Sequence, residues 1–198
     1  MTISNRLTIL RMCLIPLMII VLYIPPFQEI TTLLGLSLAE LLFGLLFVVG
    51  SLTDIFDGYL ARKRNEVTDF GKFLDPIADK LLTMTGMIYV VIYKTDYDFW
   101  WILLLIVIAR EFIVSATRMV AANKNIVIAA SVYGKVKTTI TLIAIIIILF
   151  NGFGLYLLLG DSAHYITDAI FYVSVIITVL SGVDYIVKNR QVFVTNDN

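Results

Sequence analysis

The chain has 198 residues, 60% of them hydrophobic, and a mean hydropathy of +0.93. Soluble domains contain only about 45–50% apolar residues, so this composition indicates an integral membrane protein, with one domain over residues 1–198. The net charge is zero, from 15 basic and 15 acidic residues, which gives no sign of a nucleic-acid partner, and the single cysteine excludes an internal disulfide.

Taken in chain order, six apolar runs are candidates to cross a bilayer, which requires about 20 residues. Pro25-Pro26 and polar segments such as RKRNEVTDFG, KTDYD and AANKN separate them. The sequence therefore predicts an all-α membrane protein with six transmembrane helices. The predicted spans are 7–24, 33–60, 73–93, 99–120, 136–150 and 166–187.

The basic residues gather on one side of this arrangement. If the amino terminus is inside, the loops near residues 61–72 and 121–135 and the carboxyl terminus are inside as well, and of the 15 lysines and arginines only Lys94 falls outside. Basic loop residues are retained on the cytoplasmic side of a membrane. We therefore expect both termini to be cytoplasmic.

Four aspartates flank the polar segment between the second and third runs. Asp54 and Asp57 are three residues apart, and Asp75 and Asp79 are four apart, so each pair lies on one face of its helix. The polar turn makes the two helices an antiparallel hairpin, in which the acidic stripes can face each other. With the RKR segment at the interface, a rise of 1.5 Å per residue puts Asp54 about 12 Å below it.

Carboxylates at this depth must be protonated, paired or neutralised, because a charge near the centre of a membrane helix costs about 2.5 to 3.5 kcal/mol. Oxygen ligands with no histidine or thiol nearby suit hard divalent ions such as Mg²⁺, Mn²⁺ or Ca²⁺. Four carboxylates balance the charge of two such ions. Two metal ions in a cleft then suggest phosphate chemistry.

Small residues share these acidic faces. Gly58 and Ala61 continue the first stripe, where missing side chains let a bulky phosphorylated ligand approach the helix. Arg62 offers the planar fork that matches a diphosphate. Gly71 begins the second stripe, and it serves either close ligand approach or simply the helix start.

Written as Asp54-x2-Asp57-Gly58-x2-Ala61-Arg62-x8-Gly71-x3-Asp75-x3-Asp79, the stretch resembles the signature of the CDP-alcohol phosphotransferase family at every position. The six-span layout agrees with that family's architecture, so the resemblance covers the whole chain in outline. It implies a reaction in which the hydroxyl of an acceptor alcohol attacks the β-phosphorus of a CDP-linked lipid and displaces CMP.

The resemblance also implies a role for each residue of the motif. Asp54, Asp57 and Asp75 would bind two divalent cations, Mg²⁺ or Mn²⁺, and Asp79 would take the proton of the acceptor and also touch the second metal. The residues lining the CDP site would be Gly58, Ala61, Arg62 and Gly71. Thr8 is a further candidate on the donor side, although Ser4, Asn5 and Thr8 would equally well begin a helix. The family implies a homodimer, and Gly44, Gly50 and Ser51 would support close helix packing either between two chains or within one.

The acceptor is a separate inference from basic residues farther along the chain. Arg110 is about 18 Å from the end of the fourth span and needs an anion at that depth. Glu111 points about 100° away on the helix, so we expect it to pair with Arg110 only poorly. Arg110, Arg118, Lys135 and Lys137 together suggest an acceptor that carries a phosphate.

Shorter segments refine this expectation. NRLTILR, ARE with a second arginine eight residues on, and YGKVKT resemble bacterial members of the family that join CDP-diacylglycerol to sn-glycerol 3-phosphate. That likeness implies that Arg110, Arg118 and Lys135 contact the acceptor phosphate. It also implies a multi-pass protein of the bacterial cytoplasmic membrane, with its active site facing the cytoplasm.

Other functions remain open at the level of the sequence. The same chemistry with inositol phosphate, serine or a second phospholipid as acceptor is one alternative. A membrane prenyltransferase also uses aspartate-rich helices, but its acids come as two distant clusters. Outside catalysis, intramembrane acids are typical of a cation transporter, which the one-sided placement of these aspartates disfavours.

Overall fold

A computed structural model describes the backbone of residues 3–32, 34–64, 69–95, 97–124, 126, 128 and 132–193. It describes their side chains except at 3–4, 54–64, 69–70, 72–73 and 161. Apart from one isolated bridge between Thr31 and Ser37, the regular elements in these ranges are helices. The α-helices are α1 (Ile3–Leu22), α2 (Pro25–Glu29), α3 (Leu38–Arg64), α4 (Asp69–Tyr93), α5 (Trp100–Asn123), α6 (Val132–Leu149), α7 (Leu155–Leu159) and α8 (Ala163–Lys188), and the 3₁₀ turns are η1 (Asn151–Gly154), η2 (Gly160–Ser162) and η3 (Arg190–Val192).

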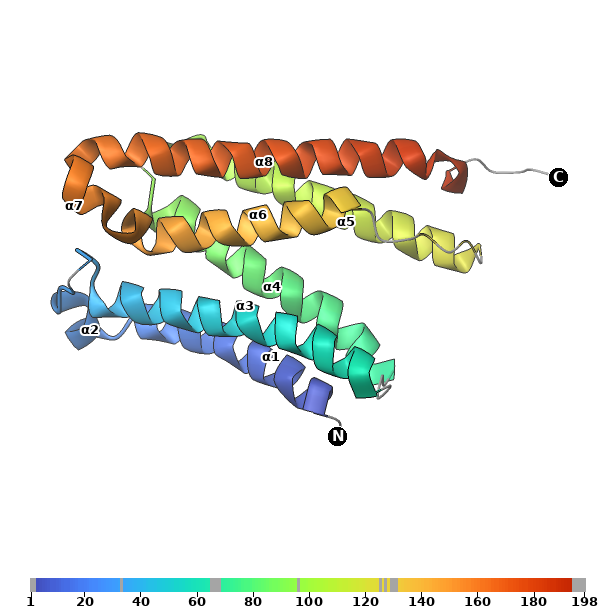
Figure 1. Ribbon diagram of the computed structural model, residues 1–198, viewed down its shortest axis with the longest axis horizontal. Coiled ribbons are helices and arrows are strands. Elements are labelled where there is room, and N and C mark those ends of the chain that lie inside the picture. The colour runs from blue at the N-terminus through green and yellow to red at the C-terminus, as the bar shows by residue number, and fades with distance from the viewer. Residues whose placement is uncertain are drawn as a thin grey trace. The chain divides into compact units, whose positions relative to one another are not determined.

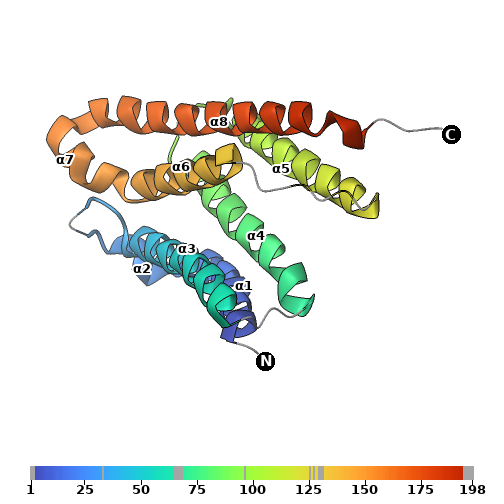
Figure 2. The ribbon, with the colours of Figure 1, turned by 45° about the vertical axis from the view of Figure 1, so that its right-hand side comes forward.

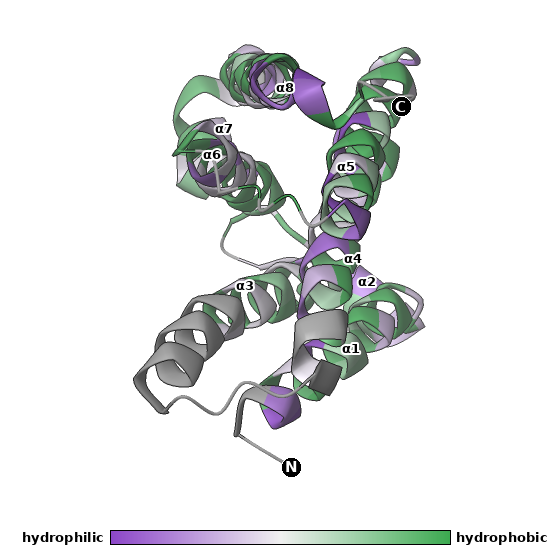
Figure 3. Cartoon of the chain, turned by 90° about the vertical axis from the view of Figure 1, so that its right-hand side faces the viewer, coloured by the Kyte–Doolittle hydropathy of each residue, from purple (hydrophilic) through white to green (hydrophobic). Residues whose placement is uncertain are grey.

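Five of these helices are long and apolar enough to cross a membrane within the described residues: α1, α4, α5, α6 and α8. In Figure 3, which colours the ribbon by residue hydropathy, hydrophobic green covers much of α1, α6 and α8. In α3 the apolar stretch with described side chains, Leu38–Thr53, is shorter. The prediction of an all-helical integral membrane protein is confirmed. That α3 also crosses the membrane, which would make six spans, stays a prediction, and so does the orientation of the termini.

The predicted second span begins too early in the sequence. Residue 33 was its expected start, but α3 begins at Leu38. A capping box sets this boundary, because the Glu40 N–H donates to Ser37 Oγ at 3.2 Å and the Ser37 N–H donates to Glu40 Oε2 at 2.8 Å. The preceding residues form a tight turn, with Gly35 at φ +68°.

The chain forms two compact units, one of Met1–Lys94 with Ile145–Thr167 and one of Thr95–Ala144 with Asp168–Asn198. In the first unit α1, α3 and α4 pack side by side, as Figures 1 and 2 show. Arg11 of α1 is fully buried in this unit and donates Nε to the Gly50 carbonyl of α3 at 3.3 Å.

Glycines allow α3 and α4 to approach closely. A Cβ at Gly50 would lie 3.0 Å from the Leu82 methyl groups, and one at Gly86 would lie 2.5 Å from Cε2 of the buried Phe47. Residues 47 and 50 thus face residues 86 and 82 in reverse order, so α3 and α4 form the predicted antiparallel hairpin. The other two small residues also pack within the chain, because Gly44 faces the Phe150 ring and the hydroxyl of Ser51 is buried and bonded to the Phe47 carbonyl.

Lys94, the one basic residue expected outside, belongs to a polar cluster. Its Nζ lies 2.7 Å from Glu40 Oε1 and donates to Asn151 Oδ1 at 3.1 Å. The Tyr89 hydroxyl donates to the same Glu40 oxygen at 3.2 Å. The cluster connects the start of α3, the end of α4 and η1, so a charge pair holds three chain segments together.

The second unit is organised by the parallel packing of α5 and α8. At one end Trp100 stacks on Phe171 with ring centroids 4.4 Å apart and donates its indole N–H to the Tyr172 hydroxyl at 3.1 Å. At the other end Lys124 Nζ donates to the Val192 carbonyl of η3 at 2.8 Å. Both helices therefore run in the same direction over their length, which brings their polar residues into register.

Gly86→Ala tests the close approach of α3 and α4. The new methyl group overlaps a buried aromatic ring, so we expect the free energy of unfolding to fall by about 1–3 kcal/mol. Thermal unfolding in detergent measures the change. Gly134→Ala is the matched control, because a Cβ there meets no atom within 4 Å and the alanine should favour the helix. Equal melting temperatures for the Gly86→Ala variant and the parent would contradict the packing described above.

Candidate functional site

The two aspartates predicted on α4 lie one turn apart. Asp75 and Asp79 are both partly exposed, and Gly71 is buried at the start of the helix. Thr8 of α1, which is buried, donates its hydroxyl to Asp75 Oδ1. The residue expected on the donor side therefore lies beside a predicted metal ligand. A carboxylate keeps further lone pairs after accepting one hydrogen bond, so Asp75 remains able to bind a cation.

The remaining motif residues lie on the last turns of α3, and their side chains are outside the described residues. These are Asp54, Asp57, Gly58, Ala61 and Arg62. Among the side chains that are described, no three acidic, histidine or cysteine residues gather as a metal site. The hairpin that carries both stripes is observed, and the facing of the stripes stays a prediction.

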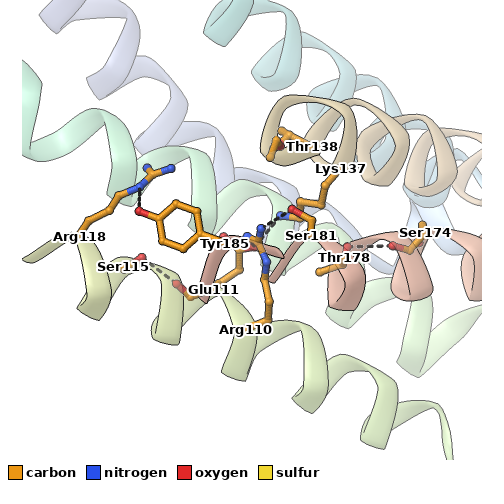
Figure 4. A network of polar contacts seen from close by, with 11 residues as sticks. Arg110, Glu111, Ser115, Arg118, Lys137, Thr138, Ser174, Thr178, Ser181 and Tyr185 are labelled. Carbon is orange, nitrogen blue, oxygen red and sulfur yellow. Dashed lines mark hydrogen bonds and ion pairs between the residues drawn. The ribbon is translucent and has the colours of Figure 1, made fainter. Parts of the chain in front are cut away.

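The second unit contains a cluster of basic residues centred on Glu111. Arg110 Nη1 lies 2.8 Å from Glu111 Oε1, and Lys137 Nζ of α6 lies 2.6 Å from the same oxygen. All three side chains are largely buried, with exposed fractions of 12%, 16% and 8% for Arg110, Glu111 and Lys137. Figure 4 shows Arg110 and Lys137 converging from different helices.

The expectation that Glu111 pairs poorly with Arg110 is therefore wrong. An offset of about 100° separates two Cα–Cβ directions, but both side chains are long enough to bend toward each other. Burial explains why they do so, since a charge removed from water needs an opposite charge nearby. The anion that Arg110 requires is thus supplied in part by the chain itself.

Lys137 was one of the four basic residues that suggested a phosphorylated acceptor, but the family likeness did not imply that it contacts the phosphate. Lys135, which was predicted, has an exposed side chain, whereas Lys137 is buried against Glu111. Residues two apart on a helix differ by about 200° in direction, so only one of this pair faces the interior. The sequence did contain a signal for a buried lysine, because Glu111 lies deep in a predicted span and was expected to pair only poorly with Arg110.

Arg118 lies two turns beyond Arg110 on α5 and contacts α8. Its Nε donates to the Tyr185 hydroxyl at 3.2 Å, and its guanidinium carbon lies 5.6 Å from the centre of that ring. The Arg118 side chain is exposed, in contrast to that of Arg110. With Arg118 included, the cluster has three positive side chains and one negative one, that of Glu111. Its net charge is therefore +2, which complements a phosphomonoester dianion.

Known proteins resemble the chain over nearly its full length. The family model described as CDP-alcohol phosphatidyltransferase matches residues 1–180. A protein of Bacillus subtilis (strain 168) is 37% identical over 196 residues, 98% of this chain and 97% of the relative. One of Rickettsia bellii (strain RML369-C) is 36% identical over 189 residues, 96% of each chain. One of Salmonella choleraesuis (strain SC-B67) is 35% identical over 192 residues, 95% of this chain and 94% of the relative. Each of the three is named CDP-diacylglycerol–glycerol-3-phosphate 3-phosphatidyltransferase.

Glu111→Gln tests whether this carboxylate holds the basic cluster together. The change leaves two buried cations close to each other without a counter-charge, and we expect a loss of about 2 kcal/mol or more in the free energy of unfolding. Thermal unfolding in detergent at low and moderate ionic strength measures it. Glu29→Gln, an equal charge change at an exposed position of α2, should leave stability unchanged. A Glu111→Gln variant as stable as the parent would mean that the cations do not depend on Glu111.

Proposed function

Because the chain belongs to the CDP-alcohol phosphatidyltransferase family, we propose that it transfers the phosphatidyl group of CDP-diacylglycerol to sn-glycerol 3-phosphate. The products are phosphatidylglycerophosphate and CMP, so the reaction is a step of phospholipid biosynthesis. Similarity to relatives that all carry this activity in their names, over nearly the whole length of both chains, is the observation that carries the proposal. The net positive charge around Arg110 supports the choice of a phosphorylated acceptor.

In this proposal the aspartate motif holds the donor end of the reaction. Asp54, Asp57, Asp75 and Asp79 would bind two divalent cations, Mg²⁺ or Mn²⁺. Asp75 and Asp79 offer hard oxygen ligands on successive turns of α4, which suits such ions. When bound, the ions would neutralise diphosphate charge and lower the pKa of a nearby alcohol. Thr8 donates to one oxygen of Asp75, and the carboxylate keeps further lone pairs with which it would bind a cation.

The other motif residues would hold the CDP group. Gly58 and Ala61 lack side chains that would keep a nucleotide away from α3, and Arg62 would pair with the diphosphate. Gly71 is buried where α4 begins, a position that also permits close approach. These four residues and Thr8 form the proposed donor side.

The chemical step then requires one proton transfer and one displacement. Asp79 would take the proton of the acceptor hydroxyl as that oxygen forms a bond to the β-phosphorus of the donor. The bond from this phosphorus to the bridging oxygen of CMP breaks, and its electron pair leaves with CMP. Arg110, Arg118 and Lys137, with Lys135 at the exposed edge of α6, would bind the acceptor phosphate and so orient the attacking hydroxyl.

The membrane arrangement is part of the same proposal. We place α3 in the membrane together with the five other long helices, which gives six spans. Both termini then lie in the cytoplasm, because this arrangement puts the basic residues other than Lys94 on the inner side. The active site would face the cytoplasm of a bacterial cell, where soluble glycerol 3-phosphate is available. A homodimer is the expected assembly of the family.

Release of CMP tests the function directly. Purified protein in detergent should release CMP from CDP-diacylglycerol with Mg²⁺ or Mn²⁺ when glycerol 3-phosphate is present, and a metal chelator should stop the reaction. Inositol phosphate, serine and phosphatidylglycerol are the comparison acceptors. Release only with one of these would refute the proposed acceptor. No release with any acceptor would favour a non-enzymatic role such as cation transport.

Asp79→Asn tests the proposed base. The amide cannot accept the proton of the acceptor, so turnover should fall by at least about 10²-fold, while binding of CDP-diacylglycerol should be largely retained. Turnover is measured by CMP release and donor binding by titration calorimetry. Asp98→Asn, an equal change at an exposed site outside the motif, serves as the control. Loss of donor binding together with turnover would make Asp79 chiefly a metal ligand.

A further inference from the structure

One face of α8 contacts both arginines of the basic cluster, although the sequence assigned this helix no part in the site. Ser181 and Tyr185 are four residues apart, hence on one face, and Gly182 lies beside Ser181. Ser181 and Tyr185 are each only 3% exposed. We call these three residues the α8 face.

Ser181 fixes the orientation of the Arg110 guanidinium. Its Oγ accepts a hydrogen bond from Arg110 Nη2 at 2.8 Å, while Nη1 donates to Glu111 at 2.8 Å. Both terminal nitrogens are therefore held by the chain. The Arg110 Nε is buried beside Gly182 without a hydrogen-bond partner among the described residues, so the position of the guanidinium charge depends on its two terminal nitrogens.

Gly182 provides the room that this orientation needs. A Cβ at position 182 would lie 2.7 Å from Arg110 Cγ and 3.4 Å from its Nε. The contact involves the base of the arginine side chain, which cannot move away without displacing the guanidinium. Any residue other than glycine at position 182 would therefore change where Arg110 lies.

Tyr185 holds the second arginine in a different way. Its hydroxyl accepts from Arg118 Nε at 3.2 Å, and the guanidinium carbon lies 5.6 Å from the ring centre. Figure 4 draws one hydrogen bond between Arg118 and the Tyr185 hydroxyl and none from the two terminal nitrogens of Arg118. Two such nitrogens form a fork of the kind that binds a phosphate through two hydrogen bonds.

We propose that the α8 face positions Arg110 and Arg118 for the phosphate of the acceptor. Ser181 and Tyr185 act through the arginines and do not touch the reacting atoms, so they are positioning residues. Preorganised donors bind an anion better than mobile ones because less side-chain freedom is lost on binding. The inference rests on the proposed function, since it concerns the affinity for glycerol 3-phosphate.

The experiment compares Ser181→Ala, Gly182→Ala and Tyr185→Phe with the parent by steady-state CMP release. Ser181→Ala and Tyr185→Phe should each raise the KM for glycerol 3-phosphate by about tenfold, as expected when a hydrogen bond to a charged group is lost. Gly182→Ala should raise it as well, because the new methyl group displaces Arg110. The KM for CDP-diacylglycerol should change by less than about twofold, within the scatter of surface substitutions. Ser181→Thr, which restores a hydroxyl, should return the acceptor KM toward that of the parent.

Two controls on the same helix separate positioning from stability. Ser174→Ala removes a buried hydroxyl that bonds only the Phe171 carbonyl of its own helix among the contacts described. Tyr172→Phe removes a hydroxyl that accepts from Trp100, a contact between α8 and α5 away from the arginines. Neither should raise the acceptor KM selectively. Because KM does not depend on the concentration of active enzyme, a partly unfolded variant still gives a valid comparison.

The outcomes separate this inference from the proposed function. A parent protein that releases no CMP with glycerol 3-phosphate refutes the proposed function itself. An active parent whose α8 variants match the two controls, or change the KM of both substrates equally, refutes the positioning role alone. If Gly182→Ala yields no folded protein, Ser181→Ala and Tyr185→Phe decide the question. A selective rise in the acceptor KM supports the proposal.

Discussion

The structure depends on how charged side chains are matched inside apolar helices. A charge removed from water is costly unless an opposite charge or several hydrogen bonds replace the solvent. Glu111 meets this requirement by binding both Arg110 and Lys137, and Glu40 meets it through Lys94. Asp75 accepts a hydrogen bond from Thr8. Except for the Arg110–Glu111 contact within α5, each pairing joins different helices or helix ends, so buried polar groups also help to determine which helices lie together.

Close helix packing makes these pairings possible. Gly50 and Gly86 let α3 and α4 approach as a hairpin, and Gly182 lets the stem of Arg110 lie against α8. In a bilayer, helices associate through such small residues because lipid is as apolar as the helix surface. Under the proposed function the same geometry would serve the site, since an arginine held against a helix has fewer conformations to lose when a phosphate binds. Stability and substrate recognition would then use the same contacts.

The helices, and the position of Asp75 and Asp79 on one face of α4, were largely predictable because both follow from local periodicity. Within the described residues the six long helices lie close to the predicted apolar runs, and Asp75 and Asp79 share a face of α4 as their spacing requires. The start of α3 was missed because Leu33 to Leu36 are apolar, while the Ser37–Glu40 capping box ends the preceding turn. The hydropathy of the residues gives no indication of a helix cap. The pairing of Arg110 with Glu111 was missed because direction on a helical wheel ignores side-chain length.

By itself, the sequence determined the class of protein, its family and the shared face of Asp75 and Asp79, because composition, apolar run length and residue spacing do not depend on how the helices pack. Tertiary structure decided which lysine faces Glu111, Lys137 and not Lys135, and placed Ser181 and Tyr185 beside Arg110 and Arg118. These contacts join residues about 26 to 71 positions apart. Periodicity shows which face a residue occupies, but the partner of that face depends on how the helices pack.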